Sequence, residues 1–172
     1  MDDALHDEAP ELISRPPQQE DVVSLCRELN RLGAKYVVVG GFAVIEAGYP
    51  RTTGDIDLLV DPAADNEMKV FEALATLPDR AVRELNAGDV EKFTVVRVSD
   101  EVLVDLMAKA SGITYEEAKG YIHVRELDGV KIPFANPDLL WRMKRRSMRP
   151  KDQGDLYFLR ELFVAEGRQP PE

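Results

Sequence analysis

The chain has 172 residues, of which 44% are hydrophobic, and it carries a formal net charge of −10. This length and apolar content predict one folded domain with a sizeable core. A run of about 18 apolar residues is absent, which argues against a membrane partner. One cysteine and two histidines argue against a disulfide, a zinc centre or thiol catalysis. The acidic start is unlike a signal peptide, so we expect a soluble cytoplasmic protein.

The composition divides the chain into three parts. Residues 1–17 carry acids and prolines with little periodic apolar content, and they predict a flexible acidic arm. Residues 18–166 are expected to form the single domain, and 167–172 a short tail. The domain begins with a helix over 18–32, where apolar residues recur at helical spacing and Gly33 follows the end.

A buried strand, a glycine pair and a second helix come next. The β-branched run at 36–39 is typical of a strand covered on both faces, and Gly40-Gly41 ends it abruptly. The following residues supply the packed side of a helix, whose first turn leaves backbone N–H groups free. These N–H donors, beside glycines that allow close approach, favour an anion such as phosphate.

The strand predicted at 55–60 carries two acids. Asp55 and Asp57 alternate with apolar residues, so both carboxylates lie on one face. Neighbouring carboxylates repel each other, and a divalent cation between them relieves that repulsion. Oxygen ligands at this density suit Mg²⁺ or Mn²⁺ together with substrate phosphates. A bare Asp-x-Asp also occurs on solvated edge strands, but the Gly-Gly turn and the Arg-Thr-Thr step at 51–53 favour the metal site.

A third carboxylate stands in an apolar segment downstream. The runs 93–98 and 102–107, separated by a polar turn, predict a β-hairpin. Asp105 is the one acid in the second run, and a buried aspartate requires a metal, an arginine or an exposed edge as its partner. From this pattern alone, a solvated face shared with Leu103 is the simpler interpretation.

The middle of the domain is predicted to be structural. A helix over 66–76 is expected to direct Met68 and three other apolar residues inward. A hairpin with an Asp-Gly turn joins strands at 123–127 and 130–134. His123 in this hairpin has no nucleophile to pair with, so it is assigned no catalytic role.

Two helices complete the chain. Asn136-Pro137 starts the first, which is expected to run to about Met148, and the second begins near Lys151. Six basic residues lie between 142 and 151, and for most of them the usual interpretation is an exposed helix face.

Gly40-Gly41, the Arg51-x-Thr53 step and Asp55-Ile56-Asp57 together resemble the signature of the DNA polymerase β-type nucleotidyltransferases. The resemblance is strongest to small prokaryotic members, including proteins of toxin–antitoxin and phage-defence systems. It implies an α+β fold, in which a mixed β-sheet is flanked by helices and followed by a C-terminal helical pair. It also implies two Mg²⁺ or Mn²⁺ ions and transfer of a nucleoside monophosphate from a nucleoside triphosphate (NTP) to an acceptor hydroxyl.

The resemblance also implies roles for particular residues. The metal ligands that it implies are Asp55, Asp57 and Asp105, the last of which also takes the acceptor's proton. The nucleotide-binding residues that it implies are Gly40, Gly41, Arg51, Thr53, Lys151 and Asp155. The C-terminal pattern is similar to that of the defence-system members, and it implies that Lys144 contacts the triphosphate, while Lys151 and Asp155 assist at the site or brace it.

The sequence leaves the acceptor open. The candidates are tRNA or another RNA, a protein hydroxyl, and a small molecule such as an aminoglycoside. An acidic surface suits a cationic drug, whereas the basic helices suit RNA. The alternative to an enzyme is a catalytically silent binding module or antitoxin, for example the partner of a toxin ribonuclease, and three intact acids argue against it.

Overall fold

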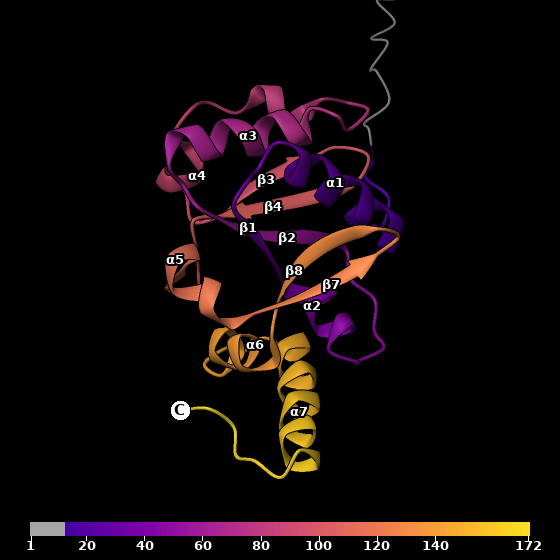
Figure 1. The fold of residues 1–172 in the computed structure, drawn as a ribbon, viewed down its shortest axis with the longest axis vertical. Coiled ribbons are helices and arrows are strands. Elements are labelled where there is room, and N and C mark those ends of the chain that lie inside the picture. Colours follow the sequence, from indigo (N-terminus) through magenta and orange to yellow (C-terminus); the bar gives the residue numbers. More distant parts are fainter. Residues whose placement is uncertain (1–12) are drawn as a thin grey trace, which may run out of the picture.

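A six-stranded mixed sheet forms the centre of the computed structural model, which describes residues 13–172 (Figure 1). The strand order is β3-β4-β2-β1-β8-β7. These strands are β1 (Tyr36–Val39), β2 (Asp55–Val60), β3 (Val96–Ser99), β4 (Leu103–Met107), β7 (Ile122–Leu127) and β8 (Val130–Ala135). A separate two-stranded ribbon joins β5 (Lys109–Ala110) to β6 (Ile113–Thr114).

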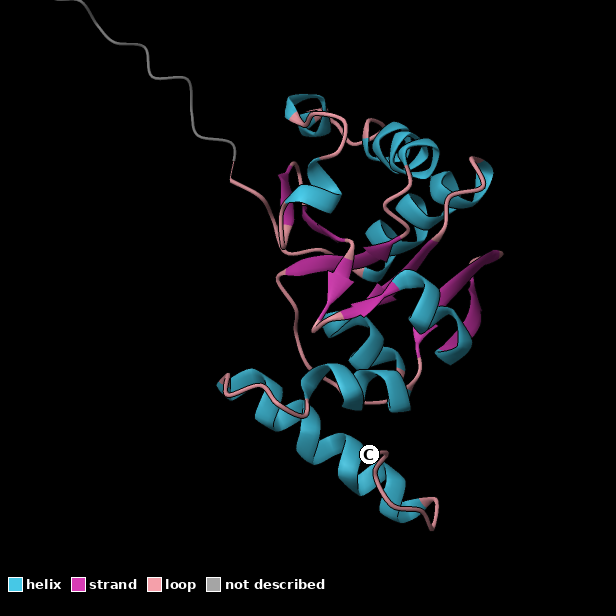
Figure 2. Ribbon diagram, turned by 90° about the vertical axis from the view of Figure 1, so that its left-hand side faces the viewer, coloured by secondary structure: helices cyan, strands magenta, loops and turns pink. Residues whose placement is uncertain are grey.

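Helices cover both faces of the sheet (Figures 1 and 2). One face carries α1 (Gln19–Arg31) and α3 (Ala64–Leu74), and the other carries α2 (Gly40–Glu46), α6 (Pro137–Lys144) and α7 (Pro150–Ala165). The shorter helices are η1 (Ala81–Glu84), α4 (Asp89–Lys92), α5 (Tyr115–Ala118) and η2 (Lys119–Tyr121). This arrangement confirms the expected α+β fold, in which a mixed sheet is flanked by helices and a helical pair ends the chain.

The register of the sheet decides which side chains meet. β1 is antiparallel to β2 and parallel to β8, and every residue of β1 is buried, as the β-branched run predicted. β2 runs parallel to β4, and this register pairs Asp57 with Asp105. β3 is antiparallel to β4 and pairs Arg97 with Asp105. Three charged residues from three adjacent strands therefore lie next to one another.

The helix predicted at 66–76 forms two residues earlier, and one prediction about it is wrong. Met68 is 69% exposed rather than directed inward. Glu67 is buried in its place, because its carboxylate accepts backbone N–H groups from Gly88 at 2.7 Å and Val90 at 3.2 Å. Leu74 is buried, as predicted, so the error concerns Met68, whose expected inward place is taken by an acid with two backbone donors.

Both ends of the described chain contact the domain. The Ser14 hydroxyl donates to the carbonyl of Asp100 at 2.6 Å, and the indole N–H of Trp141 donates to the carbonyl of Pro171 at 3.0 Å. Residues 1–12 of the expected acidic arm lie outside the described residues. None of the helices found between residues 13 and 172 has both the length and the apolar character needed to cross a membrane.

Candidate active site

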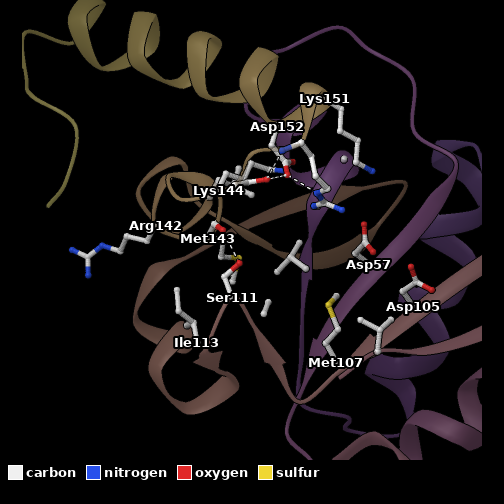
Figure 3. Close-up of a pocket in the computed structure, with 18 of the residues that line it drawn as sticks. Asp57, Asp105, Met107, Ser111, Ile113, Arg142, Met143, Lys144, Lys151 and Asp152 are labelled. Carbon is white, nitrogen blue, oxygen red and sulfur yellow. Dashed lines mark hydrogen bonds and ion pairs between the residues drawn. The ribbon is translucent and has the colours of Figure 1, made fainter. Parts of the chain in front are cut away.

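Three carboxylates meet where β2 and β4 run side by side, and Figure 3 labels two of them, Asp57 and Asp105. Asp55 and Asp57 share one face of β2, because side chains alternate along a strand. Asp105 points to the same side from β4, directly opposite Asp57. One carboxylate oxygen of each aspartate lies within 4.8 Å of the others. The structure therefore brings together the three acids that the sequence singled out.

These carboxylates are poorly solvated and repel one another. Asp105 is only 6% exposed. Burial, together with the charges of Asp55 and Asp105, raises the pKa of Asp57 to about 7, and the ammonium of Lys151 acts in the opposite sense. Hard oxygen donors that carry excess negative charge suit Mg²⁺ or Mn²⁺. The residues present therefore fit the metal ions that the resemblance implies.

Arg97 is the site residue that the sequence did not reveal. Its Nε and Nη2 donate to the two oxygens of Asp105 at 2.8 and 2.9 Å. The same Nη2 donates to Oδ2 of Asp55 at 2.9 Å. The hydrogen bonds to Asp105, together with the charges of Asp105 and Asp55, raise the pKa of the guanidinium. The available signal was its position in the predicted hairpin, where an arginine on one strand can face an acid on the other.

The glycine pair allows the end of β1 to approach the acids closely. Gly40 has a φ of +65°, and a Cβ placed there would lie 2.8 Å from Cγ of Asp57. A Cβ at Gly41 would lie 2.6 Å from Cβ of Thr53. The space that each glycine leaves is therefore filled by a side chain of the β2 region, which keeps the turn against Asp57 and against the Arg51–Thr53 step.

Substituting Gly40 by alanine is expected to destabilise the protein by about 1–3 kcal/mol, because the left-handed backbone is strained for alanine and the new methyl group overlaps Asp57. Thermal unfolding measures the loss. Gly120→Ala is the control, since no atom lies within 4 Å of a Cβ at that position and its φ is not positive. Equal melting temperatures for the two variants would contradict the close packing of Gly40.

Buried ion pairs connect the segment before β2 to the C-terminal helices. Nε of Arg51 lies 2.8 Å from Oδ1 of Asp155. Nζ of Lys144 lies 2.8 Å from Oδ1 of Asp152 and 3.0 Å from Oδ2 of Asp155. Burial disfavours ionised Asp152, but hydrogen bonds from Lys144 and two further donors outweigh burial and hold its pKa at about 2. Both cations are thus committed to aspartates of α7.

Lys151 lies at the start of α7 with an exposed side chain, and its ammonium faces Asp57 (Figure 3). The space between them belongs to a pocket of about 880 Å³, a size typical of small-molecule sites. The predicted site residues that line it are Gly40, Gly41, Arg51, Asp55, Asp57, Asp105, Lys144 and Lys151. Thr53 and Asp155 do not line the pocket themselves. They lie behind the residues that form its wall, where Thr53 packs against Gly41 and Asp155 pairs with Arg51.

A mixed sheet with acids on adjacent central strands, beside a glycine turn, defines the class of nucleotidyltransferases. The model of the family described as "Nucleotidyl transferase of unknown function (DUF2204)" matches residues 18–168. The chain therefore belongs to this family, and the match confirms the resemblance noted in the sequence. No curated protein matches the chain.

Solved structures share the fold at low sequence identity. The lincosamide antibiotic adenylyltransferase LnuA, in its lincomycin-bound form, is 14% identical with a TM-score of 0.53, over 84% of this chain and 98% of LnuA. An antigenic nucleotidyltransferase-like protein from Paracoccidioides brasiliensis is 21% identical with a TM-score of 0.52, over 86% of this chain and 79% of that protein. Both comparisons support the nucleotidyltransferase fold.

Proposed function

We propose that the protein is a metal-dependent nucleotidyltransferase, which transfers a nucleoside monophosphate from an NTP to an acceptor hydroxyl. The observation that supports this most directly is the convergence of Asp55, Asp57 and Asp105 within 4.8 Å beside the glycine turn. In a protein that only binds a partner, replacing one of the three carboxylates would relieve their mutual repulsion without loss of function. The presence of all three therefore favours an enzyme over a silent binding module.

In this proposal the three aspartates hold two Mg²⁺ or Mn²⁺ ions. Such ions neutralise charge on the transferred phosphoryl group and on the leaving pyrophosphate. Asp105 takes the proton of the acceptor hydroxyl, and the hydroxyl oxygen forms a bond to the α-phosphorus. The bond between the α-phosphorus and the pyrophosphate oxygen breaks in the same displacement.

The triphosphate tail is assigned to the wall between the glycine turn and the start of α7. The backbone of Gly40 and Gly41 lines this wall, and the exposed ammonium of Lys151 supplies positive charge beside Asp57. Arg51 and Lys144 are both paired with Asp155. We therefore assign these two cations to bracing the wall, and Lys151 to direct contact with phosphate.

The rest of the pocket edge suits a polyanionic acceptor. Arg142, Arg145, Arg146 and Arg149 line it, and we call them the basic rim. On a chain with a net charge of −10, such a local cluster favours the phosphates of an RNA end. LnuA adenylylates lincosamide antibiotics, so a small molecule is the second candidate acceptor.

One assay tests this function. The protein is incubated with Mg²⁺, α-labelled NTPs and a cell extract, in parallel with Asp55→Ala/Asp57→Ala. The proposal predicts label transfer by the parent alone, and the labelled product identifies the acceptor as RNA, protein or small molecule. Failure of the parent both to transfer label and to bind NTP with Mg²⁺ would contradict the enzyme and favour a binding module.

Charge reversal in the basic rim, Arg145→Glu/Arg146→Glu, is expected to lower transfer to RNA at low salt by about tenfold or more, because both exposed cations would contact backbone phosphates. Transfer rates measured over a series of salt concentrations check this, and the variant should show the weaker salt dependence. The matched control is Arg80→Glu/Arg83→Glu, whose exposed side chains lie at η1 outside the pocket lining. Equal loss in both variants would contradict a specific role for the rim.

A further inference from the structure

Arg97 occupies the space between two of the three carboxylates. Its Nε and Nη2 hold both oxygens of Asp105, and Nη2 also reaches Oδ2 of Asp55. These oxygens are the ones that a metal ion at this place would need. Charge-assisted hydrogen bonds to the same carboxylates therefore set the guanidinium and a metal ion in competition for common ligands.

The hydrogen bonds by which Arg97 bridges Asp55 and Asp105 lie near the protein surface, in contrast to the buried ion pairs near α7. The Arg97 side chain is 50% exposed, and it extends from β3, an edge strand of the sheet. Arg51 is only 17% exposed, and its partner Asp155 is fully buried. The carboxylates that Arg97 holds are less accessible, since the side chains of Asp105 and Asp55 are 9% and 18% exposed. Arg97 can therefore move into solvent at low cost where another cation replaces it, whereas Arg51 lies too deep for such an exchange.

The guanidinium neutralises only part of the negative charge of Asp55, Asp57 and Asp105, which we call the triad. It donates to Asp55 and Asp105, and no hydrogen bond within residues 13–172 joins it to Asp57. The carboxylate of Asp57 is left within 4.8 Å of the two other acids. A divalent cation placed among all three acids would neutralise more charge than one guanidinium on two of them.

We infer that Arg97 is a built-in competitor of the metal ions, which bridges Asp55 and Asp105 in the metal-free protein and is displaced when metal binds. The inference rests on the proposed function, because it takes the triad as the metal site. Competition lowers the affinity for free metal below that of the bare acids. Metal that arrives with a triphosphate brings further oxygen ligands, so it displaces Arg97 more readily than free metal does.

Mn²⁺ binding to the full-length chain, measured by calorimetry, tests this inference. Arg97→Met removes the guanidinium and keeps an unbranched side chain, and it is expected to bind Mn²⁺ on the order of tenfold more tightly than the parent. Arg125→Met is the matched control, because Arg125 is 54% exposed, extends from the opposite edge strand β7 and pairs with the carboxylate of Glu46. This control should bind Mn²⁺ as the parent does.

Equal or weaker binding by Arg97→Met would overturn the inference and leave the proposed function standing. Absence of Mn²⁺ binding by both the parent and Arg97→Met would overturn the metal site, and the inference with it. A second measurement needs no variant: phenylglyoxal modification of the parent, followed by peptide mass spectrometry. Arg97 should react faster at saturating Mn²⁺ while Arg125 is unchanged, and unchanged or slower reaction of Arg97 would overturn its displacement.

Discussion

Replacing Asp57 by asparagine is expected to lower nucleotide transfer by about a thousandfold or more, and to stabilise the metal-free protein. The catalytic loss follows because an amide cannot replace a carboxylate in holding the metal ions. The gain in stability follows because Asp57 is a poorly solvated acid between Asp55 and Asp105. Transfer of labelled nucleotide and thermal unfolding in EDTA measure the two effects on the same preparations.

The pH dependence of stability gives this prediction a definite sign. The pKa of Asp57 in the folded protein is about 7, above the value of 3.8 for an ordinary aspartate. Between these values the folded state binds more protons than the unfolded state, so stability falls as pH rises through this range. In EDTA, the melting temperature of the parent should therefore fall relative to that of Asp57→Asn between about pH 4 and pH 7.

Asp61→Asn is the control for both effects, since Asp61 directly follows the same strand and lies outside the triad. It should transfer nucleotide as the parent does. A melting temperature of Asp57→Asn that stays below the parent's at all pH values would contradict the repulsion among the three acids.

Lys144→Met is expected to destabilise the protein by about 3 kcal/mol. The Lys144 side chain is 10% exposed, and it is paired with Asp152 and Asp155, which are 1% and 0% exposed. Removing one partner of a buried pair typically costs about 3–5 kcal/mol, because it leaves a buried charge uncompensated. Arg149 and Arg51 still pair with these two aspartates, which places the loss at the lower end. Urea unfolding measures it.

Lys151→Met is expected to change NTP binding rather than stability, since the side chain of Lys151 is exposed. Its stability should stay within about 0.5 kcal/mol of the parent, while its affinity for NTP with Mg²⁺ falls. Together the two lysines separate bracing from phosphate binding. Unchanged stability of Lys144→Met combined with lost NTP affinity would reverse the two assignments.

Local patterns were sufficient to predict the six strands of the main sheet, the cap at Asn136 and the pair of acids on β2, whereas the role of Asp105 was implied by the family resemblance. The alternation around Asp55 and Asp57 specifies a strand with one charged face, and parallel pairing with β4 brings in Asp105. The caps were equally local: Asn136 accepts the N–H of Leu139 at 2.9 Å, as its place before a proline predicted. Alternation along a strand and the cap of a helix depend on residues a few positions apart, whereas the pairing of β2 with β4 does not.

Features that depend on distant partners were missed. Met68 was assigned to the core because the partners of Glu67, the N–H groups of Gly88 and Val90, lie more than twenty residues away. Arg97 escaped notice because only the register of β3 against β4 sets it opposite Asp105. An apolar pattern contains no information about which charged side chains find buried partners.

The most direct test of the central claim is a crystal structure of the protein with Mn²⁺ and a non-hydrolysable NTP, recorded with anomalous scattering from manganese. We predict anomalous peaks within about 2.2 Å of oxygens from Asp55, Asp57 and Asp105, with the triphosphate along Gly40-Gly41 and Arg97 released from the acids. Manganese absent from the triad, or a triphosphate bound away from the glycine turn, would contradict the account.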